Sequence, residues 1–186
     1  MQILKETKEG QELLTDFDGK FGEAFGGTAP NGSHINVIIA KRGSASHAEA
    51  VRTLASPAKG HVPFLVCLGL GNVIKPSTIV INKITIEDEK YERFFYGAAQ
   101  LGIGQGVLDA VKDGLLDKDS LGEISLLVAC WIDPECEDET KIKINSRDAI
   151  YHAIKNALMT ASEEKDYVQN LLDTYESATN NFYSGE

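Results

Sequence analysis

The sequence predicts one α+β domain in two layers, with a mixed or antiparallel sheet and helices on one face. The chain has 186 residues, of which 42% are hydrophobic, and this suits a single domain with its own core. Strand-like and helix-like segments follow one another as hairpin, helix, two strands, helix, strand and helix. A sheet covered by helices is the economical arrangement for that order.

The central strand is expected over residues 32–43, which begin and end with glycine. Positions 35, 37 and 39 are Ile or Val, whereas His34 and Asn36 occupy the positions between them. Because side chains alternate faces along a strand, His34 and Asn36 point the same way. A shorter strand over 20–25 and a turn-rich loop precede this segment, which predicts a hairpin.

A strand of related design is expected over residues 78–86, where Lys83 and Thr85 share one face. If the two strands lie in one sheet, or face each other across a subunit boundary, their polar side chains converge on a small ligand. Two apolar segments, 62–70 and 123–132, are expected to be buried strands.

Helices are expected over 46–55, 88–111, 145–158 and, in the tail, 168–175. Ser46 and Glu49 have the spacing of a capping box and open the first of these helices. Asp88 caps the second helix, and either Asn145 or Ser146 opens the third.

The chain is expected to divide into three parts. Residues 1–19 form an added arm, residues 20–160 form the folded domain, and residues 161–186 form an acidic, helical C-terminal tail.

The composition limits the classes of partner. The formal net charge of −10 argues against general binding to nucleic acid or to anionic membranes, because such binding requires clustered cations. No stretch approaches the ~20 apolar residues of a membrane span, and the N-terminus has no apolar signal core. Cys67 lies in an apolar run and is expected to be a buried, reduced thiol. The sequence therefore predicts a soluble cytoplasmic protein.

Several familiar motifs are in the wrong context. G-L-G at 69–71 lacks the third glycine and the helix start of a dinucleotide loop. G-I-G-Q-G at 102–106 lies inside a helical segment or at a break in one, where close helix packing or a nearby ligand explains it better. The four histidines are scattered and predict no metal site. His34 suits proton transfer near neutral pH, and Lys83 suits an anionic or carbonyl-bearing ligand, although a lysine on a sheet face commonly only reaches water.

An ordered set of motifs carries a family resemblance. The motifs are G-E-A at 22–24, H-I-N-V-I-I at 34–39, R-G-S at 42–44, K-P-S-T at 75–78, N-K-I-T-I at 82–86 and G-A-A-Q at 97–100. In this order and spacing, the chain resembles the formaldehyde-activating enzyme family over residues 22–160.

The resemblance implies a hydro-lyase that condenses formaldehyde with tetrahydromethanopterin, giving methylene-tetrahydromethanopterin and water. It implies a cytoplasmic homopentamer with the pterin, a co-substrate, between adjacent subunits, and it implies no metal. His34 is the implied general acid. The residues implied to contact the pterin are Asn36, Leu65, Lys83, Thr85 and Gln100.

The chain departs from the family pattern at Asn36, where the family has aspartate. A carboxylate beside an imidazole raises the pKa of the imidazole, whereas a neutral amide does not. We therefore expect His34 to hold its proton less well than in relatives, and Asn36→Asp to raise the rate near neutral pH. The departure leaves an alternative open, a non-catalytic paralogue that binds or carries the pterin or senses formaldehyde.

Overall fold

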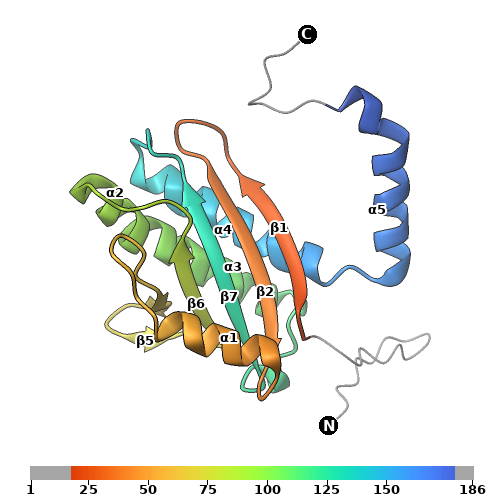
Figure 1. Cartoon of the computed structure of the whole chain (residues 1–186), viewed down its shortest axis with the longest axis horizontal. Coiled ribbons are helices and arrows are strands. Elements are labelled where there is room, and N and C mark those ends of the chain that lie inside the picture. The colour runs from red at the N-terminus through yellow and green to blue at the C-terminus, as the bar shows by residue number, and fades with distance from the viewer. Residues whose placement is uncertain (1–17, 179–186) are drawn as a thin grey trace.

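The computed structural model describes residues 18–178, which form an α+β domain around one mixed sheet (Figure 1). The strands of this sheet are β1 (Lys20–Gly26), β2 (Ser33–Lys41), β3 (Phe64–Leu65), β6 (Ser77–Asn82) and β7 (Ile124–Ile132). Their order across the sheet is β1-β2-β7-β6-β3, and β6 and β7 are the one parallel pair among these described strands. A separate two-stranded sheet consists of β4 (Cys67–Leu68) and β5 (Asn72–Val73).

The helices are α1 (Ala45–Leu54), α2 (Glu89–Arg93), a π-helical segment (Phe94–Ala99), α3 (Gln100–Lys112), α4 (Glu139–Ala157) and α5 (Ala161–Thr174), with short 3-10 turns at Lys118–Ser120 and Tyr175–Ser177. Figure 1 shows α3 and α4 behind the sheet, α1 across one end of the strands, and α5 beside the β1 edge.

The alternation expected along the central strand is confirmed. Ile35, Val37 and Ile39 of β2 are completely buried, and they form one core with residues of α3 and α4. His34 and Asn36 point to the opposite face of the sheet, which we call the open face, and are only half-buried. The hairpin is also confirmed, since β1 and β2 pair antiparallel over their full length.

The second long helix runs through its three glycines, as expected. Asp88 accepts a hydrogen bond from the backbone N–H of Tyr91 and caps α2, and the helical path then continues to the end of α3. A Cβ atom at Gly102 would lie 2.2 Å from the carbonyl oxygen of Lys143, and one at Gly106 would lie 2.3 Å from that of Arg147. The glycines therefore let α3 approach the backbone of α4, which decides in favour of helix packing.

The start of the first helix was placed wrongly. The N-cap of α1 is Ser44 rather than Ser46, and its hydroxyl accepts from the backbone N–H of His47. Ser44 follows Gly43, whose φ of +83° turns the chain out of β2 and lets the helix begin directly.

Two strand predictions also require correction. Residues 62–70 do not form one buried strand, because Val62 and Leu65 are exposed and the segment is divided at Val66 into β3, which pairs with β6, and β4, which pairs with β5. Cys67 is accordingly half-buried, although it is a free thiol as expected. The other strand, β6, ends at Asn82, whose side-chain amide donates to the carbonyl of Gly60 at 2.6 Å and also to that of Ile84. These bonds turn the chain out of the sheet before it reaches Thr85.

The third long helix begins earlier than expected. α4 starts at Glu139, capped by Asp138 through the backbone N–H groups of Thr140 and Lys141, so the segment between β7 and this helix is shorter than expected. In the tail, α5 has a capping box at Thr160 and Glu163 and every one of its residues is exposed. The expected N-terminal arm lies almost wholly outside the described residues.

Candidate functional site

The open face of the sheet carries a compact polar cluster around His34. Its ring lies near the start of β2, between β1 and β7, and 21% of its side chain is exposed. The hairpin register sets Phe25 opposite His34 and Glu23 opposite Asn36. Paired residues of neighbouring strands point to the same face, so the hairpin assembles these four side chains together.

Both ring nitrogens of His34 have charged neighbours. The ammonium Nζ of Lys83 lies 3.1 Å from Nδ1, and a carboxylate oxygen of Glu23 lies 3.3 Å from Nε2. An ammonium can only donate, so Nδ1 accepts and the proton of the neutral imidazole sits on Nε2, which faces Glu23. This protonation state is inferred from the hydrogen-bond partners.

Lys83 reaches the cluster although β6 has already ended. Its backbone N–H still donates to the carbonyl of Cys130 on β7 at 2.8 Å, which keeps the residue in register with the sheet. The side chain therefore projects over the open face toward His34. The structure thus brings together His34, Asn36 and Lys83 among the residues that the sequence selected.

Glu23 is the member of this cluster that sequence reasoning missed as a site residue. Its Oε2 atom accepts a hydrogen bond from the Asn36 side-chain amide at 2.7 Å. His34 therefore does have a carboxylate neighbour despite the asparagine at position 36, and that neighbour comes from β1. The signal was present in the sequence, since Glu23 lies between Phe21 and Phe25 at every second position, and the three therefore share one face of the strand expected to pair with the central one.

Phe25 fixes the plane of the His34 ring. The two rings stack with centroids 3.9 Å apart and planes only 4° from parallel. Phe25 as a residue is 63% exposed, so an apolar surface lies directly beside the polar cluster. Stacking restricts rotation of the imidazole and leaves its edge, with both nitrogens, as the polar part of the site.

The environment sets the pKa of His34 below its ordinary value. Burial is the largest cause, and the positive charge of Lys83 acts in the same direction. The carboxylate of Glu23 opposes both, because it favours the imidazolium. Burial likewise lowers the pKa of the Lys83 ammonium, while the carboxylate of Glu23 acts the other way. Two cationic groups in contact are costly, and Glu23 is the anion that offsets this cost.

Thr85 belongs to a neighbouring group beyond the end of β6. Its hydroxyl lies 3.0 Å from Nε2 of His61, whose Nδ1 lies 3.1 Å from the carbonyl oxygen of Asn82. The carbonyl can only accept, so Nδ1 carries the proton of the neutral ring and Nε2 accepts from Thr85. The hydroxyl oxygen of Thr85, which is exposed, is thereby left as an acceptor for a ligand.

Leu65 and Gln100 lie apart from His34. Leu65 is 37% exposed on β3, at the edge of the sheet opposite β1. Gln100 begins α3 in the helical layer, where its side-chain oxygen lies 3.3 Å from the backbone nitrogen of Cys67. Because α3 lies behind the sheet (Figure 1), Gln100 belongs to another layer than His34, and its side chain contacts the β4 segment rather than the polar cluster; the six selected residues are therefore not gathered in one cluster.

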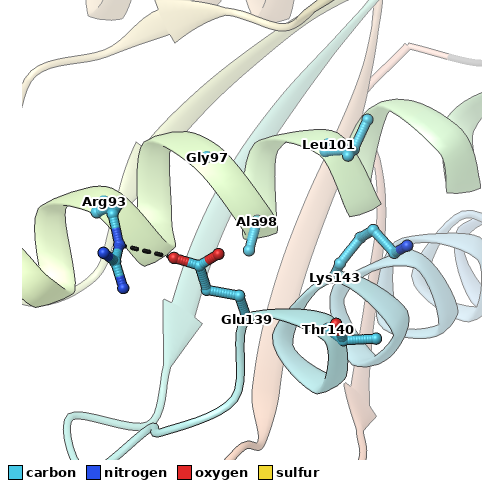
Figure 2. Close-up of a pocket in the computed structure, with 7 residues that line it drawn as sticks. All are labelled: Arg93, Gly97, Ala98, Leu101, Glu139, Thr140 and Lys143. Atoms are coloured by element: carbon cyan, nitrogen blue, oxygen red, sulfur yellow. Dashed lines mark ion pairs between the residues drawn. The ribbon is translucent and has the colours of Figure 1, made fainter.

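A surface groove on the helical side lies away from this cluster. It has a volume of about 430 Å³ and runs between the π-helical segment and the start of α4 (Figure 2). Arg93 spans it and pairs with Glu139 at 2.6 Å, and Lys143 lies at its other end. The groove has open space above Gly97, whose absent side chain has no neighbouring atom within 4 Å.

Residues 18–178 contain no group of three or more His, Cys, Asp or Glu side chains that could hold a metal ion. Within the same range, no helix combines the length and apolar character needed to cross a membrane.

Comparison with known proteins agrees with the ordered motifs of the sequence. The family model of the formaldehyde-activating enzyme (Fae) matches residues 21–183. A "5,6,7,8-tetrahydromethanopterin hydro-lyase" of Methanosarcina barkeri (strain Fusaro / DSM 804) is 32% identical over 161 residues, which are 87% of this chain and 88% of that protein. A "Bifunctional enzyme Fae/Hps" of Methanosphaera stadtmanae is 34% identical over 139 residues, which are 74% of this chain and 34% of that protein.

The bifunctional relatives are therefore matched over about a third of their length, whereas the hydro-lyase is matched over most of it. The family match begins one residue after the start of β1 and continues beyond α5, so it includes every strand and helix described above. The ordered motifs, the fold and both comparisons agree that the chain belongs to the formaldehyde-activating enzyme family.

Proposed function

We propose that the chain catalyses the condensation of formaldehyde with tetrahydromethanopterin to methylene-tetrahydromethanopterin and water. The observation that carries this proposal is the His34 ring, held by stacking on the open face with a lysine on one nitrogen and a carboxylate at the other. Membership of an enzyme family, with a relative named as a tetrahydromethanopterin hydro-lyase, supports the same reaction.

The reaction needs an acid at one step. Addition of a pterin nitrogen to formaldehyde gives a carbinolamine, and the carbon–oxygen bond of that carbinolamine must break before the second nitrogen closes the ring. Hydroxide is a poor leaving group, whereas the protonated hydroxyl leaves as water. The proposed donor of that proton is His34 in its imidazolium form, which is left as the neutral imidazole, and holding both pterin nitrogens in place supplies a proximity effect.

The remaining selected residues are proposed to hold the pterin. Asn36 and Lys83 border His34 on the open face and supply polar contacts near the reacting atoms. Thr85 offers an acceptor oxygen, and Leu65 offers apolar surface at the sheet edge. Gln100 contributes from the helical layer.

A site made by two subunits explains why these residues are spread over one chain. Gln100 lies in the helical layer and His34 on the open face, so an adjacent copy is proposed to supply one of the two groups that contact one pterin. Phe21 and Phe25 of β1 are 58% and 63% exposed, and the exposed residues of α5 include Leu171 and Leu172. Exposed apolar side chains of this size are typical of interfaces, and they support the proposed homopentamer.

The proposed setting is one-carbon metabolism in the cytoplasm of a methylotrophic cell. The proposed substrates are formaldehyde and the reduced pterin, and neither nucleic acid nor a membrane is a proposed partner. Three free cysteines among the described residues, two of them buried, suit a reducing compartment.

Turnover of the purified full chain tests the proposal. With reduced pterin and formaldehyde, the parent should consume formaldehyde faster than the spontaneous condensation, and His34→Ala should bring the rate to the spontaneous level while the fold is retained. Equal rates with and without the parent would refute the enzymatic proposal. If calorimetry shows that the pterin binds but no turnover is measured, the result would instead favour a carrier or sensor. Asn36, where the family has aspartate, is the feature that supports this alternative.

A further inference from the structure

We propose that Glu23 is a positioning residue for the reaction: its carboxylate, fixed by Asn36, holds the proton-bearing Nε2 edge of His34 in place and balances the charge of Lys83. This inference rests on the proposed function of His34 as the acid. It concerns a residue of β1 that neither the motifs nor the comparisons assign to the site.

The backbone fixes where the Glu23 side chain starts. Glu23 pairs with Asn36 in the hairpin register, and its own carbonyl oxygen accepts from the side-chain amide of Asn156 on α4 at 2.8 Å. β1 is an edge strand of the main sheet, so this second bond attaches it to the helical layer at Glu23 itself. Glu23 therefore projects onto the open face beside His34.

Asn36 then fixes the carboxylate itself. Its amide donates to Oε2 at 2.7 Å, whereas Nε2 of His34 lies 3.3 Å from the same oxygen. Nε2 is enclosed, and at this separation it has no hydrogen bond of good geometry in the structure. A buried donor without a good acceptor is unfavourable, so a small shift of the ring or of the substrate can improve its bonding.

The asparagine fits this role better than a second acid would. A neutral amide donates to a carboxylate and leaves its charge intact. A carboxylate at position 36 would instead face Glu23 as a like charge, and one of the two acids would then retain a proton more readily. The departure from the family pattern therefore leaves Glu23 as the acid that acts on His34.

The charged groups around His34 are few within the described residues. Glu23 faces it from β1, and Lys83 faces it from beyond β6. On β7 its register partner is Trp131, which is uncharged, and burial raises the pKa of the adjacent Cys130 thiol to about 12, so this thiol is neutral. Glu23 is thus the anion that favours the imidazolium against burial and Lys83.

The test is an NMR titration of the His34 ring in the full chain, together with the pH profile of turnover. Glu23→Gln keeps the shape and removes the charge, so the pKa of His34 should fall by about one unit. The pH profile of turnover should move to lower pH by the same amount. Glu23→Asp keeps the charge but shortens the reach, so an intermediate fall is expected.

Glu49→Gln is the matched control. It removes one negative charge from an exposed ion pair with Arg52 on α1 and should leave the His34 titration unchanged. A parent-like titration of His34 in Glu23→Gln would overturn the proposal, as would an equal fall in the control. If the parent has no turnover but the His34 titration still shifts in Glu23→Gln, the proposed reaction fails while the action of Glu23 on His34 stands.

Discussion

Replacing Lys83 with methionine should raise the pKa of His34. The Nζ atom lies 3.1 Å from Nδ1, so the ammonium and a protonated imidazole would have their charges about 4 Å apart. At that distance two like charges repel by about 4 kcal/mol at an effective dielectric constant of 20, and by about 1 kcal/mol in bulk water. Because 21% of the His34 side chain is exposed, we take the lower half of this range, which is about one to two pKa units.

The assay is the same NMR titration of the imidazole signals, with Lys41→Met as the control. Lys41 is exposed at the far end of β2, seven residues from His34, which is roughly 23 Å along a strand. Salt at physiological strength screens charges beyond about 8 Å, so the control should not shift the titration. An unchanged or lowered His34 pKa in Lys83→Met would show that Lys83 does not suppress protonation of the ring.

The stability of the protein should respond to pH with a definite sign at His34. Its pKa is lowered in the folded state, so the unfolded chain binds more protons between the lowered pKa and the ordinary value of 6.5. Stability therefore rises with pH through that window, and the contribution is lost as the pH falls through it. Lys83→Met should flatten this part of the curve of unfolding free energy against pH, measured by denaturant titration.

Four further substitutions test the packing, the site and the assembly. Gly102→Ala pushes α3 away from α4 and should lower the free energy of unfolding by about 1–3 kcal/mol, whereas Gly97→Ala meets open space and should raise it by up to about 1 kcal/mol. Denaturant unfolding measures both values, and a change of the same sign in both variants would contradict the packing argument. Asn36→Asp should lower the free energy of unfolding by about 1–2 kcal/mol at neutral pH, because the new carboxylate repels Glu23, and this loss should disappear in mild acid. The turnover rate of the same variant tests the increase in rate that the sequence predicts. Leu172→Glu, 60% exposed on α5, should leave the stability of an isolated subunit within about 0.5 kcal/mol but weaken self-association in light scattering; unchanged association would argue against α5 as a contact.

Much of the sheet could be predicted from local pattern. The alternation along β2 determines which side chains are buried, because strand side chains alternate faces whatever their partners are. The hairpin follows from two such segments around a turn-rich loop, and the continuous helix through Gly102 follows from helical spacing on both sides of it. These features depend on short stretches of chain, which explains why they were predicted correctly.

The errors arose where a distant contact ends a segment. β6 stops at Asn82 because its amide binds the carbonyl of Gly60, twenty-two residues away in the sequence. The segment 62–70 is apolar enough for a buried strand, yet β3 within it is an edge strand of the main sheet, and Leu65 on this strand remains exposed. Apolar composition does not distinguish a central strand from an edge, since that depends on which strand pairs with it.

The sequence by itself determined the fold class, the family and the face on which His34 and Asn36 lie, because periodicity and ordered motifs are properties of the chain alone. Only the tertiary structure decided that Glu23 and Lys83 meet His34 from its two sides. It also decided that Gln100 lies in the helical layer, where its side chain contacts Cys67 and not the cluster. The physical reason is that strand order and register bring together residues far apart in the sequence, such as His34 and Lys83 at forty-nine positions, and no local pattern encodes that order.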